Sequence, residues 1–273
     1  MPELPEVETV RLGLAKSIVG QVFKVPRLLH PRGLNPKSEV PVAALAGAQI
    51  SSVHRRGKFL WIQTNEQLAL VAHLGMSGQF RISQPEAHIH KHLRVLFPLS
   101  DFHLGFIDQR TFGWVSVGQA HGGQVPDLVS HIALDPFDPN FAPKEVVKRI
   151  RASNREIKKI LLDQAIISGI GNIYADESLW LAQINPQTIA SALSPKKVER
   201  LLSLATQVMA SALAVGGTSF DELYVNVNGE SGYFERSLNV YGREGQPCPR
   251  CSGPISRIAF ANRSTHYCFS CQK

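Results

Sequence analysis

Long apolar runs are missing from this sequence of 273 residues. Its most apolar stretches, such as residues 68–74, are far shorter than the roughly 20 residues that a membrane-spanning helix needs. The N-terminal segment is acidic and interrupted by prolines, so the basic start and apolar core of a secretory signal are also missing. We therefore expect a cytoplasmic protein that has no membrane partner.

Acidic residues are in deficit, since 22 Asp and Glu stand against 29 Lys and Arg, which gives a net charge of +7 and a pI near 9.4. A chain this basic favours a polyanionic partner, most often nucleic acid. A mildly basic enzyme without such a partner fits the charge equally well. Hydrophobic residues make up 44% of the chain, which is enough for sizeable cores, and the length indicates about two domains.

Cysteine is scarce, and all four cysteines lie near the C-terminus with the spacing Cys248-x2-Cys251-x16-Cys268-x2-Cys271. Two Cys-x2-Cys turns separated by about 15–20 residues are typical of a zinc site. Four thiolates complete a tetrahedral shell with no open position, so we expect one structural Zn²⁺. Two disulfides are the alternative, which a cytoplasmic chain disfavours.

The first half is predicted to combine one helix with many short strands. Pro5 suits a first helical turn, and apolar residues then recur at helical spacing up to Ile18. Short apolar runs follow between turn residues, as at 59–62, 68–71, 79–82 and 93–96. Runs of this length and spacing predict a β-sandwich or barrel.

The second half is predicted to be helical. Prolines between residues 136 and 143 mark a boundary that is poor in helix signals. Helices are expected at residues 145–152, 155–166, 172–184 and 195–213. Ser194 can cap the last of these helices, and Gly216-Gly217 ends it.

A glycine-bearing turn at residues 166–173 joins two of the expected helices. Asn172 is placed to cap the following helix, whose free amides and positive dipole end would then suit a phosphate. Lys158 and Lys159 precede the turn. A helical hairpin of this sort binds DNA backbone without reading bases, although the short pattern also fits a plain connection between helices.

Short blocks in a recognisable order run along nearly the whole chain. The chain starts with Met1-Pro2-Glu3-Leu4-Pro5-Glu6-Val7-Glu8-Thr9. The internal blocks are Gly57-Lys58, His73-Leu74-Gly75-Met76-Ser77-Gly78, Asp108-Gln109-Arg110-Thr111-Phe112-Gly113, and Leu161-Leu162-Asp163-Gln164 running into Gly171-Asn172-Ile173-Tyr174. The tail adds Gly216-Gly217-Thr218, Gly232-Tyr233-Phe234, Val240-Tyr241-Gly242-Arg243 and the cysteine pairs. Together the blocks resemble those of the formamidopyrimidine-DNA glycosylases.

The resemblance implies a repair enzyme that excises oxidised purines, chiefly 8-oxoguanine and formamidopyrimidines, and then cuts the abasic strand. It implies an α+β multi-domain fold, with an N-terminal β-sandwich and flanking helices, a helix–two-turn–helix domain and a C-terminal zinc-finger β-hairpin. We expect the catalytic domain at residues 1–134, the DNA-binding helical domain at 135–216, and a lesion-capping loop with the zinc finger at 217–273. The expected partner is double-stranded DNA containing oxidised purines, bound by a monomer at the bacterial nucleoid.

The resemblance places the reaction at the N-terminus. Removal of Met1 would leave Pro2 with a secondary amine, whereas a retained Met1 would make that nitrogen an amide that cannot attack. The amine can attack the sugar C1′, expel the base and form a covalent iminium, an electron sink for β- and δ-elimination. By resemblance, Glu3 helps to open the sugar ring. The remaining roles fall to Lys58 as proton donor in β-elimination, Arg263 in δ-elimination and Glu6 as a supporting acid.

A base inside a duplex must be flipped out before it can react, and the resulting void must be filled. By resemblance, Met76, Arg110 and Phe112 fill it. Met is an adaptable filler, Phe can wedge between bases, and Arg can bond the orphaned partner base. The DNA contacts that the resemblance implies are His92, Arg110, Lys158 and Asn172. The loop from Thr218 to Phe234 is expected to close over the flipped base.

Three positions depart from the family pattern. His92-Leu93-Arg94 stands where His-Asp-His is usual, which puts one phosphate contact in doubt. Asn262 stands where Gly is frequent, and Thr111 stands where Lys is common.

Two other functions stay open. The sister glycosylases that act on oxidised pyrimidines share the scaffold but usually begin Pro-Glu-Gly-Pro-Glu, so Leu4 favours purines. A non-enzymatic, zinc-dependent DNA-binding protein is the second alternative. It would not need the intact set Pro2, Glu3, Lys58 and Arg263.

Overall fold

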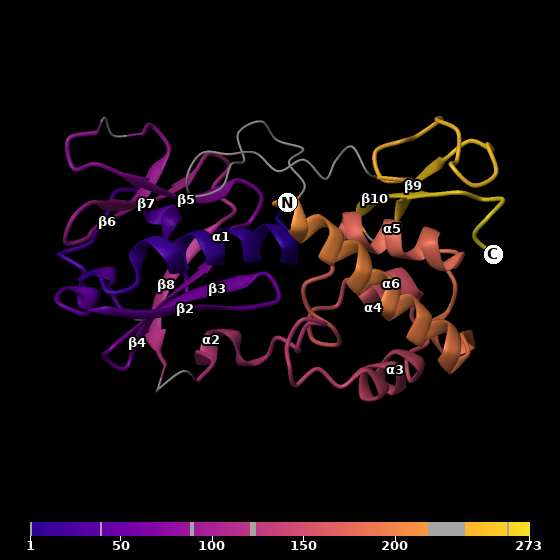
Figure 1. Ribbon diagram of the computed structural model, residues 1–273, viewed down its shortest axis with the longest axis horizontal. Coiled ribbons are helices and arrows are strands. Elements are labelled where there is room, and N and C mark those ends of the chain that lie inside the picture. Colours follow the sequence, from indigo (N-terminus) through magenta and orange to yellow (C-terminus); the bar gives the residue numbers. More distant parts are fainter. Residues whose placement is uncertain (1, 39, 88–89, 121–123, 218–237, 261) are drawn as a thin grey trace. The chain divides into compact units, whose positions relative to one another are not determined.

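The computed structural model describes residues 2–38, 40–87, 90–120, 124–217, 238–260 and 262–273. The chain folds into two compact units, which are coloured along the sequence in Figure 1. Unit 1 comprises Met1–His131 and Gly216–Tyr233, and unit 2 comprises Ile132–Val215 and Phe234–Lys273. Each helix within the described residues is too short or too polar to cross a bilayer.

Unit 1 contains a β-sandwich of two antiparallel sheets, each of four strands. One sheet has the strand order β1-β6-β7-β5, and the other has the order β2-β3-β4-β8. The strands are β1 (Arg27–Leu28), β2 (Ile50–Arg56), β3 (Phe59–Thr64), β4 (Leu68–His73), β5 (Gly78–Ser83), β6 (Leu93–Pro98), β7 (His103–Asp108) and β8 (Trp114–Gln119). The short apolar runs of the sequence thus predicted a sandwich or barrel, and the sandwich is confirmed.

Helix α1 (Leu4–Ile18) packs its apolar stripe on the sandwich core. Val10, Leu14 and Ile18 lie in one cluster with core side chains of both sheets, including Leu60 and Phe106. The predicted helix is confirmed, with Pro5 in its first turn. Unit 1 also contains η1 (Pro31–Gly33), η2 (Val42–Leu45) and α2 (Asp127–Ser130).

Unit 2 is helical and ends in a β-hairpin. Its elements are α3 (Pro143–Arg151), α4 (Ile157–Leu161), α5 (Asn172–Ala182), η3 (Ala190–Ala192), α6 (Pro195–Ala214), β9 (Ser256–Phe260) and β10 (Arg263–Tyr267). Ser194 caps α6 as predicted, because its hydroxyl accepts from the Lys197 N–H at 3.3 Å. Gly216 and Gly217 follow α6 with φ of 81° and 90°, the left-handed conformation that ends helices.

Two predictions about the helical turn were wrong. The helix expected at residues 155–166 is much shorter, because Glu156 pairs with Ile189 in an isolated β-bridge and Gln164 Nε2 bonds the carbonyls of Leu162 and Ile170 beyond the helix end. Asn172 does not cap α5, whose N-cap is Gly171 without a side-chain cap. The Asn172 amide turns instead toward strand β10.

Candidate functional site

The N-terminal residues form a buried, reciprocal hydrogen-bond box at the start of α1. Pro2, Glu3 and Glu6 are all buried. The Glu3 N–H donates to Glu6 Oε2 at 2.8 Å, and the Glu3 carboxylate accepts from the Glu6 N–H. This capping box satisfies two free donors of the helix start. It also fixes both carboxylates at the first turn of the helix, which begins directly after Pro2 and Glu3.

Helix α1 is tied to the β2–β3 turn that carries Lys58. Glu8 forms ion pairs with Arg11 at 2.8 Å and with Arg55 at 2.9 Å, and the Arg55 guanidinium also donates to the Gly57 carbonyl. Burial raises the pKa of Glu8, but bonds and charge from Arg11 and Arg55 outweigh it and lower that pKa overall. The largely buried Lys58 therefore lies in a turn that an ion pair and a hydrogen bond connect to helix α1, which begins just after Pro2.

His73 lies at the end of β4, opposite Phe59 in the β3–β4 ladder. Its ring contacts the Phe59 ring at 4.8 Å between centroids, and its Nδ1 accepts from the Gly75 N–H. Burial, followed by the charge of Lys58, lowers the pKa of His73 from 6.5 to about 4. A neutral ring with an accepting Nδ1 anchors the start of the loop that carries Met76.

The expected void-filling residues stand on two loops joined by one buried carboxylate. Asp108 accepts from the Ser77 hydroxyl at 2.5 Å and from the Gly113 N–H at 2.7 Å. It also accepts from the Arg110 N–H at 3.2 Å, which bonds Ser77 as well. The three expected residues point outward, with Met76 39% exposed, Phe112 60% exposed and Arg110 exposed. Two hydrogen-bonded loops thus present three exposed side chains.

Gly75 lets these two loops approach each other. Its φ is +61°, and a Cβ there would lie 2.4 Å from the carbonyl carbon of Phe112. Any side chain would therefore push the Phe112 segment away. Thr111, where the family commonly has Lys, adopts a φ of 56° within the same segment.

Arg94, one of the departures from the family pattern, has a structural partner. Its Nε donates to the Asp108 carbonyl at 2.7 Å. His92, the expected phosphate contact before β6, is half-buried and its carbonyl accepts from the Asp108 N–H. Arg94 therefore stabilises the segment that contains Asp108 through a hydrogen bond to its backbone. The phosphate contact of His92 stays a prediction.

In unit 2, polar side chains of α4 and α5 hold the backbone of β10. Lys158 is 0% exposed, and its Nζ lies 2.6 Å from Asp176 and 2.7 Å from Thr265 Oγ1. Asp176 also accepts from the His266 N–H at 2.8 Å, and Asn172 Nδ2 donates to the Ser264 carbonyl at 2.8 Å. The phosphate contacts expected for Lys158 and Asn172 stay predictions, since the structure gives both side chains partners in β10.

Arg263 is the first residue of β10 and is exposed, directly before the segment that this clamp holds. Asn262 precedes it with a φ of 57°. Asn tolerates this left-handed conformation better than most residues with a side chain. The replacement of the frequent Gly by Asn is therefore compatible with the turn that presents Arg263.

The cysteines form a cluster whose geometry fits zinc. The four Sγ atoms lie within 4.8 Å of one another, with 4.0 Å between Cys248 and Cys271 and 3.5 Å between Cys251 and Cys268. A tetrahedral shell with Zn–S bonds of about 2.3 Å would space its sulfur atoms about 3.8 Å apart. The cysteines are free thiols rather than disulfides.

The pKa values of the cysteine thiols bear on how the cluster would bind a cation. Burial raises the pKa of Cys248, but N–H donors of Arg250, Trp180 and Cys251 lower it overall to about 6. Burial and the neighbouring sulfur atoms raise the pKa of Cys271 to about 12. A bound Zn²⁺ would stabilise all four as thiolates, as structural zinc sites do.

Family models cover most of the chain. Residues 1–115 match the formamidopyrimidine-DNA glycosylase N-terminal domain, residues 132–223 match the H2TH domain of the same glycosylases, and residues 245–273 match the zinc finger found in FPG and IleRS. The formamidopyrimidine-DNA glycosylase of Nocardia farcinica is 50% identical over 288 residues, which cover 100% of this chain and 98% of that protein. The chain belongs to the formamidopyrimidine-DNA glycosylase family.

Solved structures of the family have the same fold. The Thermus thermophilus protein is 35% identical, with a TM-score of 0.88 and coverage of 99% of this chain and 98% of that one. A Lactococcus lactis variant bound to Fapy-dG-containing DNA is 33% identical, with a TM-score of 0.89 and full coverage of both chains. The wild-type Lactococcus lactis protein, in complex with DNA that contains an oxidised pyrimidine, has the same identity, TM-score and coverage.

Membership of the formamidopyrimidine-DNA glycosylase family confirms the α+β fold, the helix–two-turn–helix region and the single structural zinc site of Cys248, Cys251, Cys268 and Cys271. The segment expected to close over the flipped base lies outside the described residues. Asp108 and Asp176, the buried acids that hold the two presenting segments, were not among the predicted site residues. The signal in the sequence was an acid at the end of an apolar strand, as at Asp108, or within a largely apolar helix, as at Asp176 beside Glu177.

Proposed function

We propose that this chain is a bifunctional DNA glycosylase that removes oxidised purines and then cleaves the abasic strand. The observation that supports this proposal most is the buried helix start, where Pro2 precedes the hydrogen-bonded pair of Glu3 and Glu6. Glu8 and Arg55 connect this helix to the turn of Lys58. Family membership supports the same activity, since the relatives are formamidopyrimidine-DNA glycosylases.

The reaction begins with the Pro2 amine. Its lone pair forms a bond to C1′ while the N-glycosidic bond breaks, and the base leaves with the bonding pair and takes up a proton. Glu3 assists opening of the sugar ring, and Glu6 supports it through their reciprocal hydrogen bonds. Loss of the C2′ proton from the cationic iminium drives β-elimination, in which the C3′–O bond breaks and the phosphate on the 3′ side leaves, with Lys58 as proton donor. A second elimination, assisted by Arg263, releases the other phosphate.

The remaining expected residues bind DNA in this proposal. Met76, Arg110 and Phe112 fill the void that the flipped base leaves, which their exposure on two hydrogen-bonded loops supports. His92 and Asn172 serve the phosphate backbone, whereas Lys158 is wholly buried and, together with Asn172, holds the hairpin of Arg263. The four cysteines would hold Zn²⁺ without an open coordination position, so the metal would fix this hairpin rather than take part in the reaction.

In domain terms, we propose a catalytic sandwich at residues 1–134, a DNA-binding helical domain at 135–216, and a capping loop with the zinc finger at 217–273. The partner is double-stranded DNA, which a monomer binds. The relatives are bacterial, so we propose that the protein acts in the cytoplasm at the nucleoid.

Borohydride trapping tests the reaction. A duplex with 8-oxoguanine opposite C is expected to give a covalent protein–DNA adduct, because borohydride reduces the iminium. A variant with an N-terminal extension that turns the Pro2 nitrogen into an amide is expected to give none. Intact-mass measurement must show that Met1 is absent from the reactive protein. An adduct that persists with a blocked Pro2 nitrogen contradicts the mechanism, and binding without any adduct favours a non-enzymatic DNA-binding protein.

Oxidised pyrimidines are the second candidate substrate, because a relative has been solved with DNA that contains one. Binding alone therefore does not separate the two substrate classes. Trapping rates on matched duplexes do separate them, and we expect the purine lesion to react faster. A faster reaction on the pyrimidine duplex would reverse the substrate assignment.

A further inference from the structure

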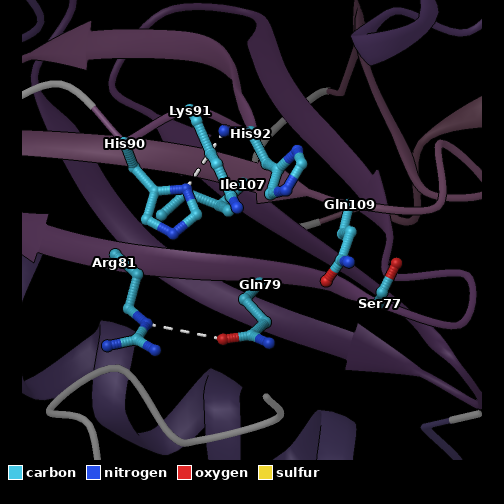
Figure 2. A pocket seen from close by; sticks show the side chains of 8 residues that line it. All are labelled: Ser77, Gln79, Arg81, His90, Lys91, His92, Ile107 and Gln109. Carbon is cyan, nitrogen blue, oxygen red and sulfur yellow. Dashed lines mark hydrogen bonds between the residues drawn. The ribbon is translucent and has the colours of Figure 1, made fainter.

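A hollow of about 290 Å³ lies on the outer face of the β1-β6-β7-β5 sheet and is here named the β5–β7 pocket. Figure 2 shows side chains from β5, β7 and the segment before β6 around it. Its lining consists of Ser77, Gln79, Arg81, His90, Lys91, His92, Ile107 and Gln109. Apart from His92, the proposed function gives these side chains no contact with DNA.

The β5–β7 pocket gathers positive charge without an acid among its described lining residues. Arg81 donates from Nε to Gln79 Oε1 at a long 3.4 Å, which is the lower of the two dashed lines in Figure 2. Burial, followed by the nearby His92, Arg81 and Lys91, lowers the pKa of His90. Arg81 and Lys91 thus bring two positive charges to one hollow, and an anion in the pocket would offset their mutual repulsion.

Hydrogen-bonding groups complete the pocket chemistry. The amides of Gln79 and Gln109 join the cations, and Ile107 contributes an apolar wall, whereas the Ser77 hydroxyl donates its proton to Asp108. Arginine and lysine beside neutral donors are the side chains that bind phosphate oxygens in proteins.

The pocket also lies at the base of the void-filling loops. Ser77 directly follows Met76, and Gln109 directly precedes Arg110. Asp108 bonds both segments, through the Ser77 hydroxyl and the Arg110 N–H. Backbone phosphates next to a void filled by these loops would therefore lie near residues of the pocket lining.

We propose that the β5–β7 pocket binds a phosphate group of the DNA backbone next to the void, with Arg81 and Lys91 as its charged contacts. The assignment rests on the proposed function in one respect, because the loops must enter the duplex for that phosphate to reach the pocket. A free phosphate-bearing molecule is the other source of the same chemistry.

Salt dependence of duplex binding tests the contact. Each phosphate contact contributes about 0.9 to the slope of log affinity against log salt concentration. For the R81Q/K91Q variant we expect a slope smaller by about 0.9 and affinity weaker by roughly three- to tenfold near 0.1 M salt, on damaged and undamaged duplex alike. The matched control is K24Q/K37Q, which removes the same charge at two exposed lysines. Lys24 bonds the far end of β6 and Lys37 lies beyond η1, so their removal is expected to leave the slope nearly unchanged.

Imidazole signals of His90 and His92 identify the source of the phosphate. Titration with the undamaged and damaged duplex is expected to shift both signals, and R81Q/K91Q is expected to reduce that shift. A shift with inorganic phosphate at low millimolar concentration but none with either duplex would overturn the DNA assignment. Unchanged signals with both ligands, or a variant slope equal to that of the wild type, would overturn the site. Lys91 is exposed, so K91Q alone keeps the test available if the double variant unfolds.

Failure of the proposed function gives a different result. A wild-type protein that forms no adduct with 8-oxoguanine duplex refutes glycosylase activity, yet its salt slope and imidazole shifts still report on the pocket. Normal adduct formation with an unchanged slope in R81Q/K91Q refutes the pocket alone.

Discussion

Asp108 of unit 1 and Asp176 of unit 2 are both buried carboxylates beneath exposed functional side chains, but they are neutralised differently. Asp108 accepts from neutral donors, namely the Ser77 hydroxyl and the N–H groups of Arg110 and Gly113. Asp176 faces the buried ammonium of Lys158 at 2.6 Å and also accepts from the His266 N–H.

The two carboxylates have different partners because the segments that they hold lie at different distances along the chain. Asp108 accepts from N–H groups of its own loop and from the Ser77 hydroxyl in the neighbouring loop of Met76, so short-range donors are enough. Asp176 and Lys158 belong to two helices and must hold a strand that lies about 90–107 positions later in the chain. A buried ion pair supplies strong, directed bonds for that task, but it leaves an unpaired charge if either partner is lost.

Zinc removal is expected to have the largest effect and to perturb the structure of unit 2 alone. Structural zinc contributes about 10–16 kcal/mol to small zinc-binding folds, so the C268S/C271S variant or a chelated protein is expected to lose the β9–β10 hairpin and strand cleavage. The measurement is metal content together with indole NMR signals. Trp180, whose Nε1–H donates to Cys248 Sγ, is expected to shift, while Trp61 and Trp114 of unit 1 stay unchanged. Equal shifts in all three would contradict independent units.

Loss of Lys158 is expected to be next in size. K158M leaves the Asp176 carboxylate buried without its cation, which costs about 3–5 kcal/mol. Denaturant unfolding measures this loss, and the ratio of β- to δ-elimination products reports whether Arg263 has lost its place.

A double replacement provides the control for Lys158. K158M/D176L removes both charges and is expected to be more stable than K158M, because no buried charge remains unpaired. A double variant that is no more stable than K158M would show that packing, rather than charge, holds this hairpin. In that case the contrast with Asp108 would disappear.

Loss of the Asp108 charge is expected to cost less, about 2 kcal/mol, since D108N keeps the side-chain shape and leaves no ion unpaired. The new amide group would face a peptide or hydroxyl donor, so the Arg110–Gly113 segment would loosen. Thermal unfolding and the affinity ratio between damaged and undamaged duplex check both effects. A cost for D108N above that of K158M would reverse the order of the two clamps.

Acid is expected to weaken unit 1 gradually through His73. The pKa of His73 is lowered to about 4 by burial and then by Lys58, so the unfolded chain takes up this proton near 6.5 and the folded chain near 4. The contribution is fully present above pH 6.5 and is lost as the pH falls toward 4, with a slope of about 1.4 kcal/mol per pH unit. Unfolding of H73Q against pH is expected to lack this slope. The same slope in H73Q would assign it to other groups.

Much of the fold could be predicted from local sequence patterns. The stripe that ends at Ile18 predicted α1, and the short apolar runs predicted the sandwich strands, because burial of one face imposes a period on the sequence. The helix at residues 155–166 could not be bounded in this way. Its ends depend on a bridge from Glu156 to Ile189 and on the Gln164 side chain, contacts that no local pattern encodes.

The candidate site divides in the same manner. Ordered blocks along the sequence were enough to name Pro2, Glu3 and Lys58, because their residue types and order identify the family. The partners of Lys158 were not predictable. A lysine beside an apolar turn suggests a phosphate contact, whereas the folded unit closes α4, α5 and β10 around it and leaves it 0% exposed.

The zinc ligands, the family, and the helical and strand character of each half follow from the order of residues alone, since spacing and periodicity are properties of the chain. Folding, in contrast, fixes which acids stabilise the exposed residues. The roles of Asp108 and Asp176 arise because folding excludes water and leaves N–H, hydroxyl and ammonium groups as their partners, several of which lie far away along the chain. Folding also gathers Arg81, His90 and Lys91 around one hollow, since β5 and β6 lie on the two sides of β7.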